Sequence, residues 1–172
     1  MIDSIFTFFR LFFRTLRGSE SPKQLAWGIA LGMGIGLIPN DSLFVAILAV
    51  LILATKTNLF VASVSAILFS WAGYVGDDAL HRLGVRILTV PSWQAYFAWA
   101  SQAPILPWTR FNNTVVMGSL ALSVAISYPV YYLSLAFFEN VSPRIHQKLA
   151  PFRIYRFLTG TPVPATSPGD SI

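Results

Sequence analysis

Two short polar segments within apolar sequence carry the side chains best suited to binding chemistry. The candidate ligand-binding residues are Asn40, Asp41, Ser42, Arg110, Asn112, Asn113 and Thr114. A carboxylate near membrane depth is costly and usually faces a cavity or a partner, and a guanidinium is its natural counter-charge. The pattern predicts a site for a lipid headgroup, a small solute or an ion, with Asp41 and Arg110 within about 8 Å of each other.

The same side chains also suit a purely structural role. Asn, Asp and Ser are favoured N-cap residues, because their side-chain oxygens accept hydrogen bonds from the first backbone N–H groups of a helix. Asn40 to Ser42 could cap a helix over Leu43–Thr55, and Asn112 to Thr114 could cap the helix that follows. Capping and ligand binding are compatible, and the sequence leaves both open.

Signatures of catalysis are missing from the sequence. It has no P-loop, no HExxH and no nucleophile elbow, and the Gly-x-Gly-x-Gly run at Gly32–Gly36 lies inside an apolar segment. His81 follows Asp77, and Arg82 follows Asp78, by four residues, a spacing at which both pairs can meet on a helix surface. A metal would need further ligands, and there is no cysteine. We therefore expect no enzyme activity, no cofactor and no metal site.

The composition indicates a membrane protein. Of 172 residues, 55% are hydrophobic and 11% are charged, whereas about 25% are charged in a typical soluble domain. The mean hydropathy is +0.62. The net charge of +5 arises mostly from residues near the two ends, where it suits an anionic membrane surface. The expected partners are membrane lipids, and no nucleic acid is expected.

Several apolar segments are too short for a simple membrane crossing, which takes about 20 residues. Leu25–Ile38 and Leu43–Thr55 are two such segments, Leu59–Val75 is the best candidate for a conventional span, and Val115–Ser127 and Val130–Phe138 follow later in the chain. Pro39 and the polar residues after it separate the first two segments, so these predict an interrupted or re-entrant helix hairpin. Pro129 could kink or divide the last two. The expected fold is an all-α, polytopic integral membrane protein.

A faint internal repeat suggests two repeated halves, residues 22–93 and 94–141. A shift of 72 residues places Leu25–Trp27 on Phe97–Trp99 and the first polar break on the second. Matching interrupted segments in two halves mark the binding sites of many transporters. Two re-entrant hairpins in inverted halves would explain this pattern. Four short, tilted crossings with parallel halves would explain it equally well.

Gly28, Gly32 and Gly36 form a stripe without side chains along one helix face. Such a stripe lets another backbone approach closely. The approaching backbone could be the Leu43–Thr55 arm, another part of this chain, a second copy, or another envelope protein. The last two options would suit a membrane scaffold or assembly partner, which is the alternative to ligand binding.

Charge predicts the topology. Residues 1–20 mix phenylalanines with regularly spaced arginines and predict an amphipathic interfacial helix. Residues 21–141 form the membrane domain, and residues 142–172 form a basic tail that is disordered at its end. Because both ends are basic, the positive-inside rule predicts two cytoplasmic termini and an even number of crossings.

One order of residues resembles a known family. Ser21-Pro22, the glycine stripe, Pro39 and Asn58 are similar to the core of a bacterial inner-membrane family classed as a domain of unknown function. The resemblance covers about residues 21–71. It implies an inner-membrane location and work with other envelope components, and it implies no activity and no catalytic residues.

Overall fold

The computed structural model describes residues 21–141, and every regular element in that range is helical, which confirms the all-α prediction. The predicted interfacial helix (residues 1–20) and basic tail (residues 142–172) lie outside the described residues. The longer helices are α2 (Pro22–Leu37), α3 (Leu43–Ala54), α4 (Leu59–Val75), α5 (Asp77–Leu88), α6 (Gln94–Gln102) and α7 (Thr114–Ala136). The short ones are the 3-10 turns η1 (Pro91–Trp93) and η2 (Leu106–Thr109), and the π turn η3 (Phe137–Val141).

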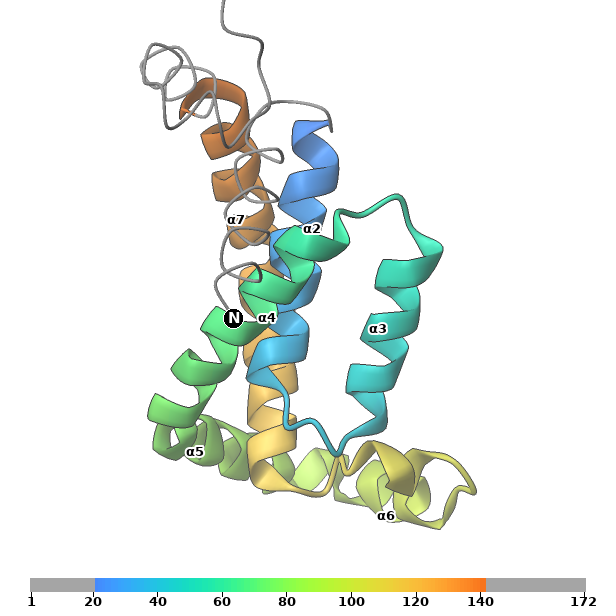
Figure 1. Ribbon diagram of the computed structural model, residues 1–172. Helices are drawn as coiled ribbons and strands as arrows, with labels where there is room; N and C mark the ends of the chain where they lie inside the picture. Colours follow the sequence, from blue (N-terminus) through green and yellow to red (C-terminus); the bar gives the residue numbers. More distant parts are fainter. Residues whose placement is uncertain (1–20, 142–172) are drawn as a thin grey trace, which may run out of the picture.

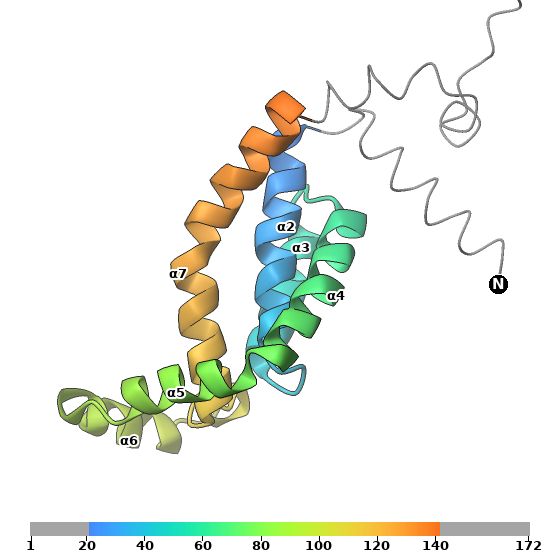
Figure 2. The same ribbon diagram turned by 90° about the vertical axis from the view of Figure 1, so that its left-hand side faces the viewer.

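The helices form a bundle with a cross-piece at one end. α2 packs between α4 and α7, and α3 stands beside α2 (Figure 1). The chain bends by 78° between α4 and α5. As a result, α5 and α6 lie across the end of the bundle (Figure 2). The start of α2 and the end of the α7–η3 segment lie near each other at the opposite end (Figure 2). Between α2 and α7, the rings of Trp27 and Tyr131 lie 4.9 Å apart.

Local sequence signals explain where the helices begin. Ser21 accepts a hydrogen bond from the backbone N–H of Gln24, and the Gln24 side chain accepts one from the Ser21 N–H, which completes a capping box before α2. Pro22 occupies the first turn, where a missing N–H costs nothing. The Asn58 side chain caps α4 by accepting from the Val61 N–H at 2.7 Å.

The glycine stripe packs against α4. A Cβ atom added to Gly28 would lie 3.1 Å from the carbonyl oxygen of Asn58, and Cβ atoms at Gly32 and Gly36 would overlap the carbonyls of Ala62 and Ala66. The contacts advance in the same direction along both helices, so α2 and α4 run parallel. Of the partners that the sequence left open, the structure places another part of the same chain on the stripe, and the α3 arm lies elsewhere.

A second close crossing joins α5 to α7, and it has no counterpart in the sequence predictions. A Cβ at Gly84 would overlap the carbonyl of Thr114, and a Cβ at Gly118 would overlap the carbonyl of Leu80. Each glycine thus makes room for the other helix. This contact fixes the start of α7 against the cross-piece and leaves the polar loop before α7 near the α2–α3 turn.

α7 runs without interruption through Pro129. The sequence allowed for two segments here, but the helix continues, so Pro129 does not divide it. Proline removes one N–H from the ladder, which membrane helices tolerate. Thr114–Asn140 is long and apolar enough to cross a bilayer, and it is the one helix in the described range that meets both criteria alone.

The 72-residue repeat aligns unlike elements. It pairs α2, which has 16 residues, with α6, which has 9 residues and lies in the cross-piece. The segments thus differ in length and in orientation within the bundle. The two-halves hypothesis therefore rests on the sequence correspondence alone.

Candidate functional site

The first polar loop joins α2 to α3. α2 ends because Ile38 is extended (φ −83°, ψ 134°) and precedes Pro39, which disfavours helical backbone at the residue before it. Ser42 then caps α3 by accepting from the N–H of Phe44 at 3.2 Å. Ser42 is only 4% exposed, although its neighbour Asp41 is exposed. The loop therefore turns one polar side chain inward and one outward.

The second polar loop joins η2 to α7. Arg110 adopts a left-handed backbone (φ 53°), and it is the one non-glycine residue in residues 21–141 with a positive φ. This conformation is held by two backbone bonds, from Arg110 N–H to the Pro107 carbonyl (3.0 Å) and from Asn113 N–H to the Arg110 carbonyl (2.9 Å). Phe111 is buried and its ring lies 6.1 Å from that of Phe97 in α6. The left-handed turn thereby sets the direction in which Arg110 leaves the backbone.

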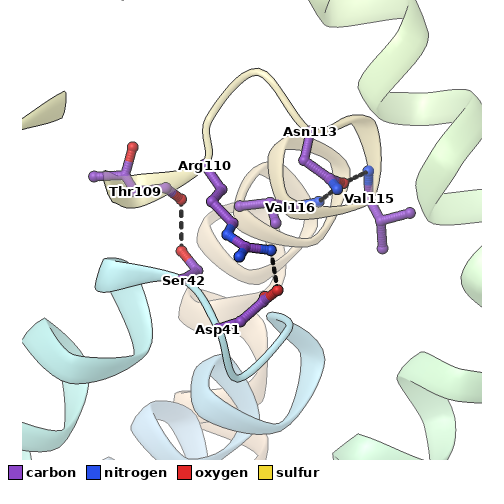
Figure 3. A network of polar contacts seen from close by, with 7 residues as sticks. All are labelled: Asp41, Ser42, Thr109, Arg110, Asn113, Val115 and Val116. Atoms are coloured by element: carbon purple, nitrogen blue, oxygen red, sulfur yellow. Dashed lines mark hydrogen bonds and ion pairs between the residues drawn. The ribbon is translucent and has the colours of Figure 1, made fainter. Parts of the chain in front are cut away.

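The two loops bind each other, as Figure 3 shows. The Arg110 guanidinium forms an ion pair with the Asp41 carboxylate, although 69 positions separate them in the chain. Beside it, the Ser42 hydroxyl donates to the Thr109 carbonyl at 2.7 Å in a buried position. The proximity of Asp41 and Arg110 predicted from the sequence is thus present.

The ion pair lies at the protein surface. Each side chain is 53% exposed. A carboxylate has about four acceptor positions and a guanidinium has five donors. One hydrogen bond, from the Arg110 guanidinium to the Asp41 carboxylate, joins the two groups, so both keep free hydrogen-bonding capacity. Adjacent positive and negative groups with free donors and acceptors can bind a molecule that carries both charges.

Asn113 has a capping role. Its side-chain oxygen accepts from the N–H groups of Val115 (2.9 Å) and Val116 (3.2 Å) at the start of α7. Ser42 caps α3 in the same way. The capping hypothesis therefore holds for these two residues, and the Asp41–Arg110 pair exists beside the caps.

The remaining candidate residues take no part in the contacts between the two polar loops. Thr114 contacts His81, with 2.7 Å between its hydroxyl oxygen and the ring Nδ1. The expected pairing of His81 with Asp77 is therefore replaced by a contact between α5 and α7, while the expected Asp78–Arg82 ion pair forms at 3.2 Å. Asn40 and Asn112 are exposed and make no side-chain hydrogen bond within residues 21–141. In the same range, no three acidic, His or Cys side chains are close enough to hold a metal ion.

Sequence inspection missed the contribution of Thr109 to this site. Its buried carbonyl accepts a hydrogen bond from the Ser42 hydroxyl, and its own hydroxyl donates to the Leu106 carbonyl at 2.6 Å. Every residue carries a carbonyl, so residue type does not signal this role. The acceptor becomes recognisable only when the two loops are placed in space.

The comparisons with known proteins add one distant relative. An uncharacterized protein of Treponema pallidum (strain Nichols) is 27% identical over 150 residues, which cover 85% of this chain and 90% of the relative. No protein-family model matches the chain, and no solved structure matches it. The similarity extends through nearly the full length of both proteins, and it indicates no activity, because the relative is itself uncharacterized.

Proposed function

We propose that the chain is a non-catalytic, multi-pass protein of the bacterial inner membrane that binds, and in doing so helps to move, a zwitterionic headgroup or solute at Asp41 and Arg110. The observation that carries the proposal is the half-exposed ion pair between two helix breaks. A phosphate would bind Arg110, and an ammonium group would bind Asp41. Phosphoethanolamine, free or as a lipid headgroup, has this chemistry.

Exposed apolar surface supports placing the bundle in a membrane. α3 contains no charged residue, and yet it exposes large apolar side chains, namely Ile47, Val50 and Leu53. The aromatic side chains of the cross-piece are also exposed, namely Trp93, Tyr96, Trp99 and Trp108. Trp and Tyr gather where a bilayer meets water. α5 and α6 would then lie along one membrane surface, with the bundle helices extending away from it.

The depth of the α2–α3 hairpin supports four short membrane crossings, by α2, α3, α4 and α7. Its turn contacts Thr109 and Arg110 just before α7 begins, at the end of the bundle where α4 stops. A shallow re-entrant hairpin would turn near mid-bundle instead. At 1.5 Å per residue, α2, α3 and α4 are about 24, 18 and 26 Å long, and all three are shorter than a core of about 30 Å. Local thinning of the bilayer accommodates such a mismatch.

The location of the chain ends supports cytoplasmic termini. The first and last described residues lie at the end opposite the cross-piece (Figure 2). Lys23 and Lys56 lie at this same end. In the sequence, the arginine-bearing residues 1–20 come directly before it and the basic residues 142–172 come directly after it. The positive-inside rule assigns such an end to the cytoplasm.

The scaffold role is a second candidate, favoured by α3. Ile52 is the only buried residue of this twelve-residue apolar helix, so most of its surface is free to meet another membrane protein. The glycine stripe is occupied by α4, so a partner would bind at α3 instead. Enrichment of one protein with the wild type, and its loss with Val50→Lys, would favour this role.

Native mass spectrometry of the detergent-solubilised protein tests the headgroup site. Phosphatidylethanolamine should bind more tightly than phosphatidylcholine, whose trimethylated amine cannot donate a hydrogen bond to Asp41. Asp41→Asn and Arg110→Gln should each abolish this preference. Asp78→Asn and Arg82→Gln remove the partners of an exposed ion pair on α5 and provide matched controls.

Soluble phosphoethanolamine separates the two possible sources of the headgroup. Competition at concentrations similar to those of the lipid indicates that the solute suffices, and no competition indicates that the lipid is required. Equal lipid preference in the wild type and in both Asp41 and Arg110 variants would contradict the proposed site.

A further inference from the structure

A groove between α2 and α3 opens at the end of the bundle opposite the Asp41–Arg110 pair. Its volume is about 320 Å³. It is lined by Lys23, Gln24, Trp27, Leu31, Leu51, Thr55, Lys56 and Thr57. The first four of these residues come from α2 and the others from the end of α3 and the turn after it, so only the tertiary structure brings them together.

The polar side chains of the groove are of two kinds. Two are lysines, and the others already form hydrogen bonds within the protein. Lys23 and Lys56 are exposed, and neither forms an ion pair within residues 21–141. The Gln24 side chain completes the capping box, and the Thr55 hydroxyl donates to the Leu51 carbonyl at 2.8 Å. Two ammonium groups therefore remain available to a ligand.

The position of Lys23 adds to the positive potential. Lys23 lies in the first turn of α2, where the helix dipole is positive, and no acidic residue in that turn offsets it. An anion bound here would meet two lysines and the positive end of a helix. Trp27, Leu31 and Leu51 supply apolar surface in the same groove. One end of the ligand must thus be anionic and the rest apolar.

We propose that this groove binds one anionic phospholipid, with its phosphate at Lys23 and Lys56 and an acyl chain along Trp27, Leu31 and Leu51. This inference rests on the membrane placement given under Proposed function, but it concerns a separate site at the other end of the bundle. Basic pockets between membrane helices on the cytoplasmic side bind anionic lipid headgroups. A small soluble anion would leave the apolar wall of the groove unused.

Native mass spectrometry with phosphatidylglycerol and phosphatidylcholine tests the inference. The wild type should bind phosphatidylglycerol more tightly. Each lysine near a membrane surface contributes about fivefold to the affinity for an anionic lipid, so Lys23→Gln with Lys56→Gln should weaken binding about 25-fold. The matched control, Arg82→Gln with Arg86→Gln, removes the same charge from α5 and should retain nearly full affinity. Leu31→Trp, which fills the groove and keeps both lysines, should also weaken phosphatidylglycerol binding.

Four outcomes would overturn the groove site. Equal weakening by the lysine and arginine double variants would mean that net charge alone attracts the lipid. Wild-type affinity in Leu31→Trp would mean that the apolar wall is unused. Binding of glycerol phosphate as tightly as the lipid would have the same meaning. Equal binding of both lipids by the wild type would overturn the groove but leave the membrane placement intact, whereas a protein that stays in solution without detergent would contradict that placement.

Discussion

The contact between the glycine stripe and α4 predicts opposite effects for two similar substitutions in α2. A Cβ at Gly32 would overlap the Ala62 carbonyl and lie 2.9 Å from Cβ of Ser65, so backbone would have to move. Two residues further on, a Cβ at Gly34 would meet only Cδ1 of Leu48, at 3.1 Å. That atom ends a flexible side chain and can shift. Both glycines are buried in one helix, so they form a matched pair.

The expected magnitudes follow from two opposing terms. Replacing glycine by alanine in a helix gains up to about 1 kcal/mol of propensity, and overpacking a tight contact costs about 1–3 kcal/mol. Because the overlap at Gly32 is with backbone, which cannot swing aside, its cost lies in the upper part of this range, about 2–3 kcal/mol. Gly32→Ala should therefore lose about 1–2 kcal/mol of unfolding free energy. A protein of this size shifts by about 2–4 °C per kcal/mol, so its melting temperature should fall by about 2–8 °C. Gly34→Ala should melt at or slightly above the wild-type temperature.

Thermal unfolding of the detergent-solubilised protein, followed by far-ultraviolet circular dichroism, measures both variants under one condition. The comparison cancels changes in helix propensity, because both substitutions are glycine to alanine in α2. If Gly32→Ala is as stable as Gly34→Ala, the close approach of α2 to α4 is absent in solution, and the reasoning from the carbonyl contacts fails.

Three further predictions concern other contacts. Gly118→Ala should lower the melting temperature by several degrees, because its Cβ would overlap the Leu80 carbonyl in the α5–α7 crossing; a stability equal to that of Gly34→Ala would contradict this crossing. A double-mutant cycle with Asp41→Asn and Arg110→Gln should give a coupling of about 0.5–1 kcal/mol, since both side chains are half exposed, and strictly additive losses would mean that the pair does not form. The cysteine-free chain permits single-cysteine labelling in intact inner-membrane vesicles of known orientation: Ala79→Cys should react from the outer face and Lys56→Cys only from the cytoplasmic face, and the reverse pattern would overturn the orientation.

Much of the fold could be predicted from the sequence, because local signals determine helix boundaries. Ser21-Pro22 with Gln24 begins α2, Pro39 follows its end, and Asn58 begins α4 at the predicted residue. The segment Leu59–Val75 has the predicted bounds. The division at Pro129 was not realised, because in a long apolar helix the loss of one hydrogen bond is outweighed by continuing the helix.

Part of the candidate site also follows from sequence. Opposite charges beside two polar breaks indicated that Asp41 and Arg110 would meet, and residue type indicated caps at Ser42 and Asn113. Sequence spacing wrongly suggested His81 with Asp77, because an i, i+4 interval permits a contact without requiring it. The Thr114 hydroxyl, 33 positions away, competes for His81 once α5 packs on α7.

The sequence by itself determined where helices start and stop, how apolar they are and which loops carry charge. These properties depend on neighbouring residues, whose effects are local. Only the tertiary structure decided that α4 covers the glycine stripe, that Thr109 accepts from Ser42, and that Lys23 and Lys56 share a groove. Each of these contacts joins residues at least 30 positions apart. Their pairing depends on which helix faces pack together. The packing is determined by how closely the backbones can approach along whole helices, and not by the type of any single residue.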